Sequence, residues 1–195
     1  MMEIHLIRHG KTLANEKKLY CGKTDLPLSE IGKEELISLI NQGIYPPPAD
    51  MFFTSGLLRA DQTLDVIYGN VGRITVPDIA EYHFGLFDMK SYEELKEQDD
   101  YQAWITDETG VVSCPGGESK IQFEKRIIEG YTCILDKLLQ AGSNSAFVSC
   151  HGGTITCIME YLMPGQKNFY EWQPQPGRGY TLYYVSEQFQ GYVII

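Results

Sequence analysis

The stretch of sequence that decides the fold lies near the start of the chain and reads Ile4-His5-Leu6-Ile7-Arg8-His9-Gly10-Lys11-Thr12. Its apolar first half, Glu3 to Arg8, predicts a buried β-strand that ends at a cation, an imidazole and a glycine. In open α/β sheets, ligands bind at the carboxyl ends of the strands. The guanidinium of Arg8 is suited to binding a phosphate, and the imidazole of His9 can act as base, acid or nucleophile.

A second segment near the other end of the chain has the same order of features. Ser145 to Cys150 is a short apolar run that predicts a central strand, and His151-Gly152-Gly153 leads from it into a predicted helix from Thr154 to Tyr161. Because both histidines follow strands, we expect them to face each other at the carboxyl edge of one sheet. The first N–H groups of the helix would add donors for an anion.

The rest of the chain alternates predicted strands and helices. The predicted helices run from a cap at Ser29 to Ile40, over 58–68, and from Gly116–Ser119 through Leu138; the predicted strands are Met51 to Thr54, a short one around 75–77, and a closing hairpin of 180–185 and 192–195. This alternation predicts an α/β fold, a three-layer sandwich in which helices flank a mostly parallel central sheet. The closing hairpin could add an antiparallel edge.

The middle of the chain differs from this pattern. Residues 81–118 are rich in aromatic and acidic side chains and lack strand signals, so we expect a helical, lid-like insertion over the carboxyl edge of the sheet. Its aromatic side chains are expected first as the core of the lid and second as a wall for a substrate. We expect residues 1–195 to form a single domain.

Composition sets limits on the class of protein. The chain has 195 residues, is 43% hydrophobic and 22% charged, and carries a formal net charge of −10, which argues against nucleic acid or an anionic membrane as a partner. It has no apolar run long enough to span a membrane, and its first residues do not predict a signal peptide. Its five cysteines are scattered without a Cys-x-x-Cys pair, so we expect reduced thiols and a cytoplasmic location.

Two further charged residues complete a candidate site with Arg8, His9 and His151. Arg59 stands at the start of a predicted helix, and two arginines with two histidines would form a pocket for a dianion without any metal ion. A neutral imidazole there could attack phosphorus and form a phosphohistidine. The leaving alkoxide needs a proton, and the candidate donor is Glu81, because a neighbouring phosphate dianion favours a protonated carboxyl group.

Other phosphate-binding machinery does not fit the sequence. A cysteine-dependent phosphatase needs an arginine six positions after its cysteine, and none of the five cysteines has one. The run Gly22-Lys23-Thr24 is no P-loop, because Lys17 occupies the position that requires a glycine. The chain has neither an Asp-x-Asp pair nor a His-Glu-x-x-His motif.

Several blocks of the chain, taken in order, resemble the histidine phosphatase (phosphoglycerate mutase-like) superfamily. The blocks are Arg8–Thr12 with Asn15, then Gly22 to Gly32, Thr54–Thr63, Glu81–Gly85, Pro115–Ser119 and Val148–Gly153. The short length is similar to that of the compact phosphatase branch, which includes the α-ribazole phosphatases. One departure is Phe87-Asp88-Met89, where many relatives have Trp-Glu-Gly, and it leaves Asp88 as a minor rival to Glu81 as the proton donor.

The resemblance implies a role for each matching residue. His9 would be the nucleophile and Glu81 the proton donor, and the phosphoryl group would be bound by Arg8, Arg59, His151 and Asn15. We take four more residues as candidates for contact with the substrate, namely Thr12, Gly22, Gly152 and Arg178. No cofactor and no metal ion is expected.

The expected activity is metal-independent hydrolysis of a phosphomonoester through a phosphohistidine. The expected substrate is a small phosphorylated metabolite whose identity the sequence leaves open. Two alternatives stay open: a mutase that returns the phosphoryl group to a second hydroxyl, and a non-catalytic module that binds a phosphometabolite. A homodimer is also left open.

Overall fold

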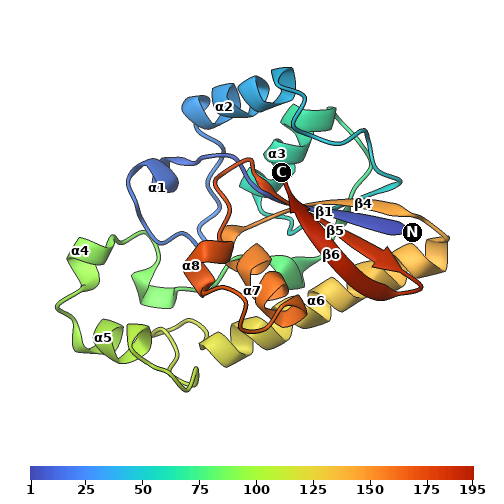
Figure 1. The fold of residues 1–195 in the computed structure, drawn as a ribbon. Coiled ribbons are helices and arrows are strands. Elements are labelled where there is room, and N and C mark those ends of the chain that lie inside the picture. Colours follow the sequence, from blue (N-terminus) through green and yellow to red (C-terminus); the bar gives the residue numbers. More distant parts are fainter.

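The computed structural model describes residues 1–195 and is built on one six-stranded sheet with the strand order β3-β2-β4-β1-β5-β6 (Figure 1). The strands are β1 (Met2–Arg8), β2 (Met51–Thr54), β3 (Ile74–Thr75), β4 (Ser145–Cys150), β5 (Gly179–Val185) and β6 (Gln188–Ile194). The first four strands pair in parallel, and β5 is antiparallel to both β1 and β6. The predicted α/β architecture, with a mostly parallel sheet and an antiparallel hairpin at one edge, is confirmed.

Helices cover both faces of the sheet (Figure 1). The helices are α1 (Leu13–Glu16), α2 (Glu30–Asn41), α3 (Leu58–Tyr68), α4 (Tyr92–Leu95), α5 (Asp99–Ile105), α6 (Lys120–Ala141), α7 (Gly152–Leu162) and α8 (Phe169–Trp172), with short 3₁₀ turns η1 (Pro77–Ile79) and η2 (Gly85–Phe87). Helices α2 and α3 lie on one face, and α6 and α7 lie on the other. These are the three layers of the predicted sandwich.

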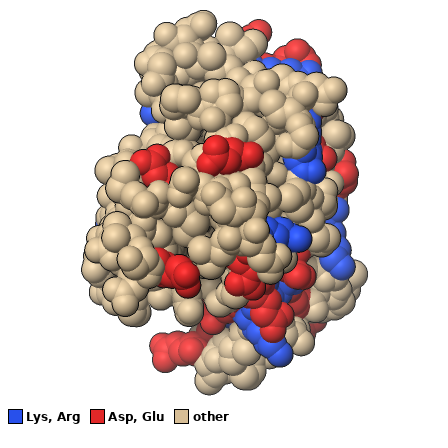
Figure 2. Space-filling model, turned by 90° about the vertical axis from the view of Figure 1, so that its right-hand side faces the viewer, with Lys and Arg blue, Asp and Glu red and all other residues tan.

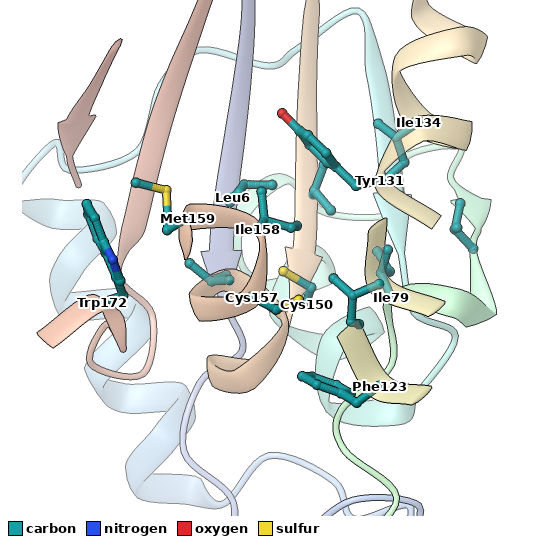
Figure 3. Packing of buried hydrophobic residues seen from close by; sticks show 14 of the residues in the cluster. Leu6, Ile79, Phe123, Tyr131, Ile134, Cys150, Cys157, Ile158, Met159 and Trp172 are labelled. Atoms are coloured by element: carbon teal, nitrogen blue, oxygen red, sulfur yellow. The ribbon is translucent and has the colours of Figure 1, made fainter. Parts of the chain in front are cut away.

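The larger core lies between the sheet and helices α6 and α7. Figure 3 shows side chains of the sheet, such as Leu6 and Cys150, facing Ile158 of α7 and Ile134 of α6. Neighbouring residues of one strand serve opposite faces, because side chains alternate along a strand: Phe147 packs in the smaller cluster with α3, whereas its neighbours in β4 pack in the larger one. Both faces are therefore apolar, as expected for a parallel sheet covered on two sides.

Local signals in the sequence explain where the main helices begin and end. Ser29 accepts a hydrogen bond from the backbone N–H of Gly32 and caps α2, and Ser119 caps α6 by accepting one from Gln122. Helix α6 ends at Gly142, which adopts the left-handed conformation that favours glycine.

Two predicted boundaries were wrong. Strand β3 ends at Thr75 rather than extending to residue 77, because Pro77 begins the 3₁₀ turn η1. Strand β6 begins at Gln188 rather than 192, because Ser186 and Glu187 make a two-residue turn with positive φ at both positions. Such hairpin turns are usually signalled by Asn-Gly or Asp-Gly, and Ser-Glu carries no such signal.

Residues 81–118 form η2, α4 and α5 with the loops between them, on the side of the molecule toward which the parallel strands point (Figure 1). Their aromatic rings pack on one another, with ring centroids 5.5 to 5.9 Å apart among Phe87, Tyr101 and Trp104. These rings extend the larger core of the protein to the carboxyl edge of the sheet.

On the face of the molecule shown in Figure 2, lysine and arginine side chains occur singly or in small groups among aspartates and glutamates, and no broad basic patch is visible. No helix of the chain combines the length and the apolar character that a membrane span requires.

Candidate active site

A cavity of about 590 Å³ opens at the carboxyl ends of the central strands. Five of the residues predicted from the sequence line it: Arg8, His9, Thr12, Asn15 and Glu81. Arg59 and His151 are completely buried and are not part of its lining. Arg8 is the last residue of β1 and His9 follows it, so the position of the strand in the middle of the sheet fixes where both side chains enter the cavity.

His9 is held in one tautomer. Its Nδ1 lies 2.7 Å from the backbone oxygen of Gly10, and because a carbonyl oxygen only accepts hydrogen bonds, Nδ1 must carry the proton. The neutral ring therefore has its lone pair on Nε2. Burial, together with the positive charges of Arg59 and Arg8, holds the pKa of His9 well below its usual range.

His151 stands opposite His9 and is completely buried. The two ring centroids are 5.1 Å apart, with an edge-on arrangement of the rings. The Nε2 atom of His151 lies 2.8 Å from the hydroxyl of Ser55, whereas its Nδ1 has no hydrogen-bond partner. Burial is the main reason that the pKa of His151 is well below its usual range, and Arg59, His9 and Arg8 lower it further.

The two arginines are fixed by backbone carbonyls. Arg8 donates from Nη1 to Pro174 at 2.8 Å, and Arg59, which is completely buried, donates to Thr24 at 3.0 Å and Gly22 at 2.8 Å. The Nε–H group of each arginine has no partner. Buried donors without a partner are costly, and a phosphate oxygen is an acceptor that would satisfy them.

Glu81 is oriented by two backbone N–H groups. One carboxylate oxygen accepts from Tyr82 at 2.9 Å and the other from Gly153 at 3.0 Å, at the first turn of α7. A methyl group at position 153 would overlap with this carboxylate, so the Glu81 side chain would have to shift to admit one.

The segment that carries Glu81 is held in place by contacts with an ion pair between Arg126 and Glu118. Arg126 of α6 donates to the backbone oxygens of Asp78 and Ala80 at 2.8 Å and pairs with Glu118 at 2.6 Å. Glu118 in turn accepts from the backbone N–H of His83. The backbone on both sides of Glu81 is therefore held by hydrogen bonds to Arg126 and Glu118.

Asp88, the rival to Glu81, does not line the cavity. Its two carboxylate oxygens accept from the backbone N–H groups of Gly22 and Thr24 and from the Thr24 hydroxyl, at 2.7 to 2.9 Å. It thus orders the loop whose carbonyl oxygens bind Arg59.

The remaining predicted residues are placed in different ways. Asn15 accepts from both the N–H and the hydroxyl of Thr12, and both line the cavity. Gly152 begins α7 beside Arg8, and Gly22 is pressed against the backbone of Tyr82, but neither lines the cavity. Arg178 does not line it either, and the contact it makes with the site is through its backbone oxygen, which accepts from the N–H of Arg8 at 3.0 Å.

The structure adds lining residues that motif reasoning missed. They are Leu19, Tyr20, Cys21, Lys120, Glu124, Cys157, Glu160, Phe169, Tyr170 and Gln173. Phe169, Tyr170 and Gln173 come from α8 and the residue that follows it. The sequence signal for this helix is a capping box, in which the side chains of Asn168 and Glu171 each accept a hydrogen bond from the backbone N–H of the other residue. No three His, Cys, Asp or Glu side chains converge in a way that could hold a metal ion.

Comparison with known proteins decides the family. Residues 4–190 match the sequence profile described as the histidine phosphatase superfamily (branch 1). The chain belongs to this superfamily. The resemblance seen in the ordered sequence blocks is thereby confirmed.

Similar proteins within the histidine phosphatase superfamily include both phosphatases and mutases. The chain is 28% identical over 166 residues to the probable phosphoglycerate mutase GpmB of Yersinia pestis, which covers 84% of this chain and 75% of that protein. The structure of a putative alpha-ribazole-5'-P phosphatase from Escherichia coli has a TM-score of 0.81 at 23% identity, covering 97% and 93% of the two chains. A phosphoglycerate mutase from Thermus thermophilus has a TM-score of 0.70 at 26% identity, covering 98% of each chain.

Proposed function

We propose that this histidine phosphatase superfamily member is a phosphomonoester hydrolase that acts on a small phosphorylated metabolite through a phosphohistidine on His9. The observation that carries the proposal is the Nδ1–H bond from His9 to the Gly10 carbonyl, which leaves Nε2 as the nitrogen with the lone pair. Because burial and two guanidinium groups lower the pKa of His9, the ring is neutral and ready to attack at neutral pH.

Two displacements complete the reaction. In the first, Nε2 of His9 forms a bond to phosphorus while the P–O bond to the leaving group breaks, and the protonated carboxyl of Glu81 gives its proton to the departing alkoxide. In the second, water attacks the phosphohistidine, Glu81 takes a proton from that water, and the N–P bond breaks. Phosphate is released and His9 is again neutral.

The cations act on the phosphoryl oxygens. We assign Arg8, Arg59 and His151 to this role, with Asn15 as a further contact. The charges of Arg59 and Arg8 act on the pKa of His9, and the ring of His151 lies 5.1 Å from that of His9. Each of the three residues also has a buried nitrogen without a hydrogen-bond partner. Phosphoryl transfer needs mainly positioning and neutralisation of charge, which these groups can supply without a metal ion.

The test is phosphate release from a panel of phosphorylated metabolites, using the wild-type protein and two variants. His9→Ala is expected to lower the rate at least a thousandfold. His83→Ala, a histidine outside the cavity, serves as the matched control and is expected to keep the rate. Full activity of His9→Ala would contradict the mechanism, and so would a loss of activity with EDTA that added metal restores.

A mutase is the second candidate, because the similar protein from Yersinia pestis is named a probable phosphoglycerate mutase. Incubation with 3-phosphoglycerate, with and without 2,3-bisphosphoglycerate, separates the two activities. Phosphate release faster than isomerisation supports the hydrolase, and the reverse supports the mutase. Tight binding of phosphometabolites with no turnover would instead indicate a non-catalytic module.

A further inference from the structure

The part of the cavity that lies beyond the phosphate-binding residues has a wall of closely packed aromatic rings, whose planes are tilted or edge-on to one another. Tyr20, Tyr82, Phe84, Trp104 and Phe123 all line it. The ring of Phe84 lies 5.0 Å from that of Tyr20 and 5.1 Å from that of Tyr82, and the ring of Tyr82 lies 5.0 Å from that of Phe123. Each ring is thus held in place by its neighbours.

The polar atoms of this aromatic wall are already occupied within the protein. The hydroxyl of Tyr20 bonds to that of Tyr101 at 2.6 Å. The hydroxyl of Tyr82 donates to the backbone oxygen of Glu118 at 2.8 Å and accepts from the indole N–H of Trp104 at 3.0 Å. The wall therefore offers a ligand ring faces and edges rather than hydrogen-bonding groups.

The charges around this aromatic wall are unfavourable to a second anionic group. Apart from Arg8, the one cation that lines the cavity is Lys120, and its ammonium group donates to the backbone oxygen of Asp107 at 2.6 Å. Glu124 and Glu160 also line the cavity, and the pKa of Glu160 is raised because it is partly buried and close to Glu124. A carboxylate on the leaving group would add a third negative charge beside these two.

We propose that the leaving group of the substrate is an alcohol that carries a planar aromatic ring and no anionic group, with the ring packed against Tyr20, Phe84 and Trp104. This inference rests on the proposed function, since it assumes that the phosphoryl end of the substrate binds beside His9. Aromatic rings pack well edge-on or offset against other rings. Tyr20 and Phe84 are the partly exposed rings of the wall, whereas Tyr82, Trp104 and Phe123 are buried. Phosphoglycerate, which is small and has a carboxylate, is disfavoured on both counts.

The first experiment compares three alkyl phosphates, so that the leaving groups are chemically similar: 2-phenylethyl phosphate, glycerol 3-phosphate and 3-phosphoglycerate. We expect kcat/KM for 2-phenylethyl phosphate to be at least tenfold higher than for either of the others. Equal or higher values for glycerol 3-phosphate or 3-phosphoglycerate would overturn the inference while leaving the proposed hydrolase intact.

Variants test the two halves of the inference separately. Phe84→Leu should lower kcat/KM for 2-phenylethyl phosphate at least fivefold and change that for glycerol 3-phosphate less than twofold, whereas Leu86→Ala, an exposed neighbour outside the cavity, should change neither. Glu160→Gln should raise kcat/KM for 3-phosphoglycerate severalfold without raising that for glycerol 3-phosphate. Parallel changes for all substrates would contradict the assigned roles.

A binding measurement keeps the inference testable if no substrate is turned over. Calorimetry with 2-phenylethylphosphonate and 2-carboxyethylphosphonate, which cannot be hydrolysed, compares the same two kinds of group. Tighter binding of the phenyl phosphonate, together with no turnover of any of the three alkyl phosphates, would contradict the hydrolase and support the ligand class. Equal or weaker binding of the phenyl compound would overturn the ligand class.

Discussion

The proton on His9 determines what this residue can do. The carbonyl oxygen of Gly10 fixes the proton on Nδ1, and the low pKa of the ring keeps it from gaining a second proton near neutral pH. Gly10 is itself fixed, because its N–H donates to the hydroxyl of Thr63, which donates to the backbone oxygen of Arg59. The backbone that sets the tautomer is thereby connected to the residue that anchors the second guanidinium.

Glu81 is expected to matter most when the leaving group is poor. Removing a general acid typically lowers a rate a hundredfold or more, so Glu81→Gln should lower turnover of alkyl phosphates by about that factor and turnover of p-nitrophenyl phosphate much less. Steady-state kinetics with both substrates measures the difference. Asp88→Asn is the control, and it should affect both substrates alike because Asp88 orders a loop. An equal loss for both substrates in Glu81→Gln would contradict the acid role.

At the scale of elements, the site depends on the segments that directly follow two strands, β1 and β4. Strand β1 delivers Arg8 and His9, and β4 leads through His151 into the first turn of α7. The N–H of Gly153 in that turn holds Glu81, a residue from a distant segment of the chain. The beginning of α7 thus connects the second histidine to the candidate acid.

Gly153→Ala tests this connection. The added methyl group overlaps with the Glu81 carboxylate, so the carboxylate must move, and the rate with alkyl phosphates should fall at least tenfold. The melting temperature should change little, because alanine is favoured over glycine within a helix. Gly72→Ala, at an exposed position where a methyl group meets nothing within 4 Å, is the matched control. Unchanged activity of Gly153→Ala would show that the position of Glu81 is unimportant.

Residues next to a strand end were predictable from the sequence. Apolar runs followed by His-Gly indicated β1, β4 and both histidines, because strand ends in an α/β sheet lie at one edge. The contribution of α8 was not predictable, because Tyr170 and Gln173 reach the cavity through the tertiary arrangement alone. The backbone contact between Arg178 and Arg8 was likewise not predictable, because no local pattern encodes it.

At the scale of the whole molecule, folding places two histidines in an environment that disfavours a positive charge on their rings. His9 and His151 are both buried beside two arginines, and the pKa of each is lowered. The unfolded chain, in contrast, binds protons on these histidines at their ordinary pKa of about 6.5. Folding therefore opposes protonation of the site.

The consequence is sensitivity to acid. Because the unfolded state binds more protons below about pH 6.5, the free energy of unfolding should fall as the pH falls, by up to about 1.4 kcal/mol per pH unit for each histidine. Urea denaturation between pH 7.5 and 5.5 measures this slope. The His9→Asn variant should show a shallower slope than wild type. A stability that stays constant or rises toward pH 5.5 would contradict the assigned protonation states.

The central claim is that His9 carries the phosphoryl group during turnover. Mixing the protein with a hydrolysed phosphorylated substrate, quenching in alkali and mapping the modified peptide by mass spectrometry tests it directly. The account predicts an acid-labile, alkali-stable phosphoryl group on His9 that is absent from His9→Ala. Turnover with no phosphoryl group on His9, or with one on a different residue, would contradict it.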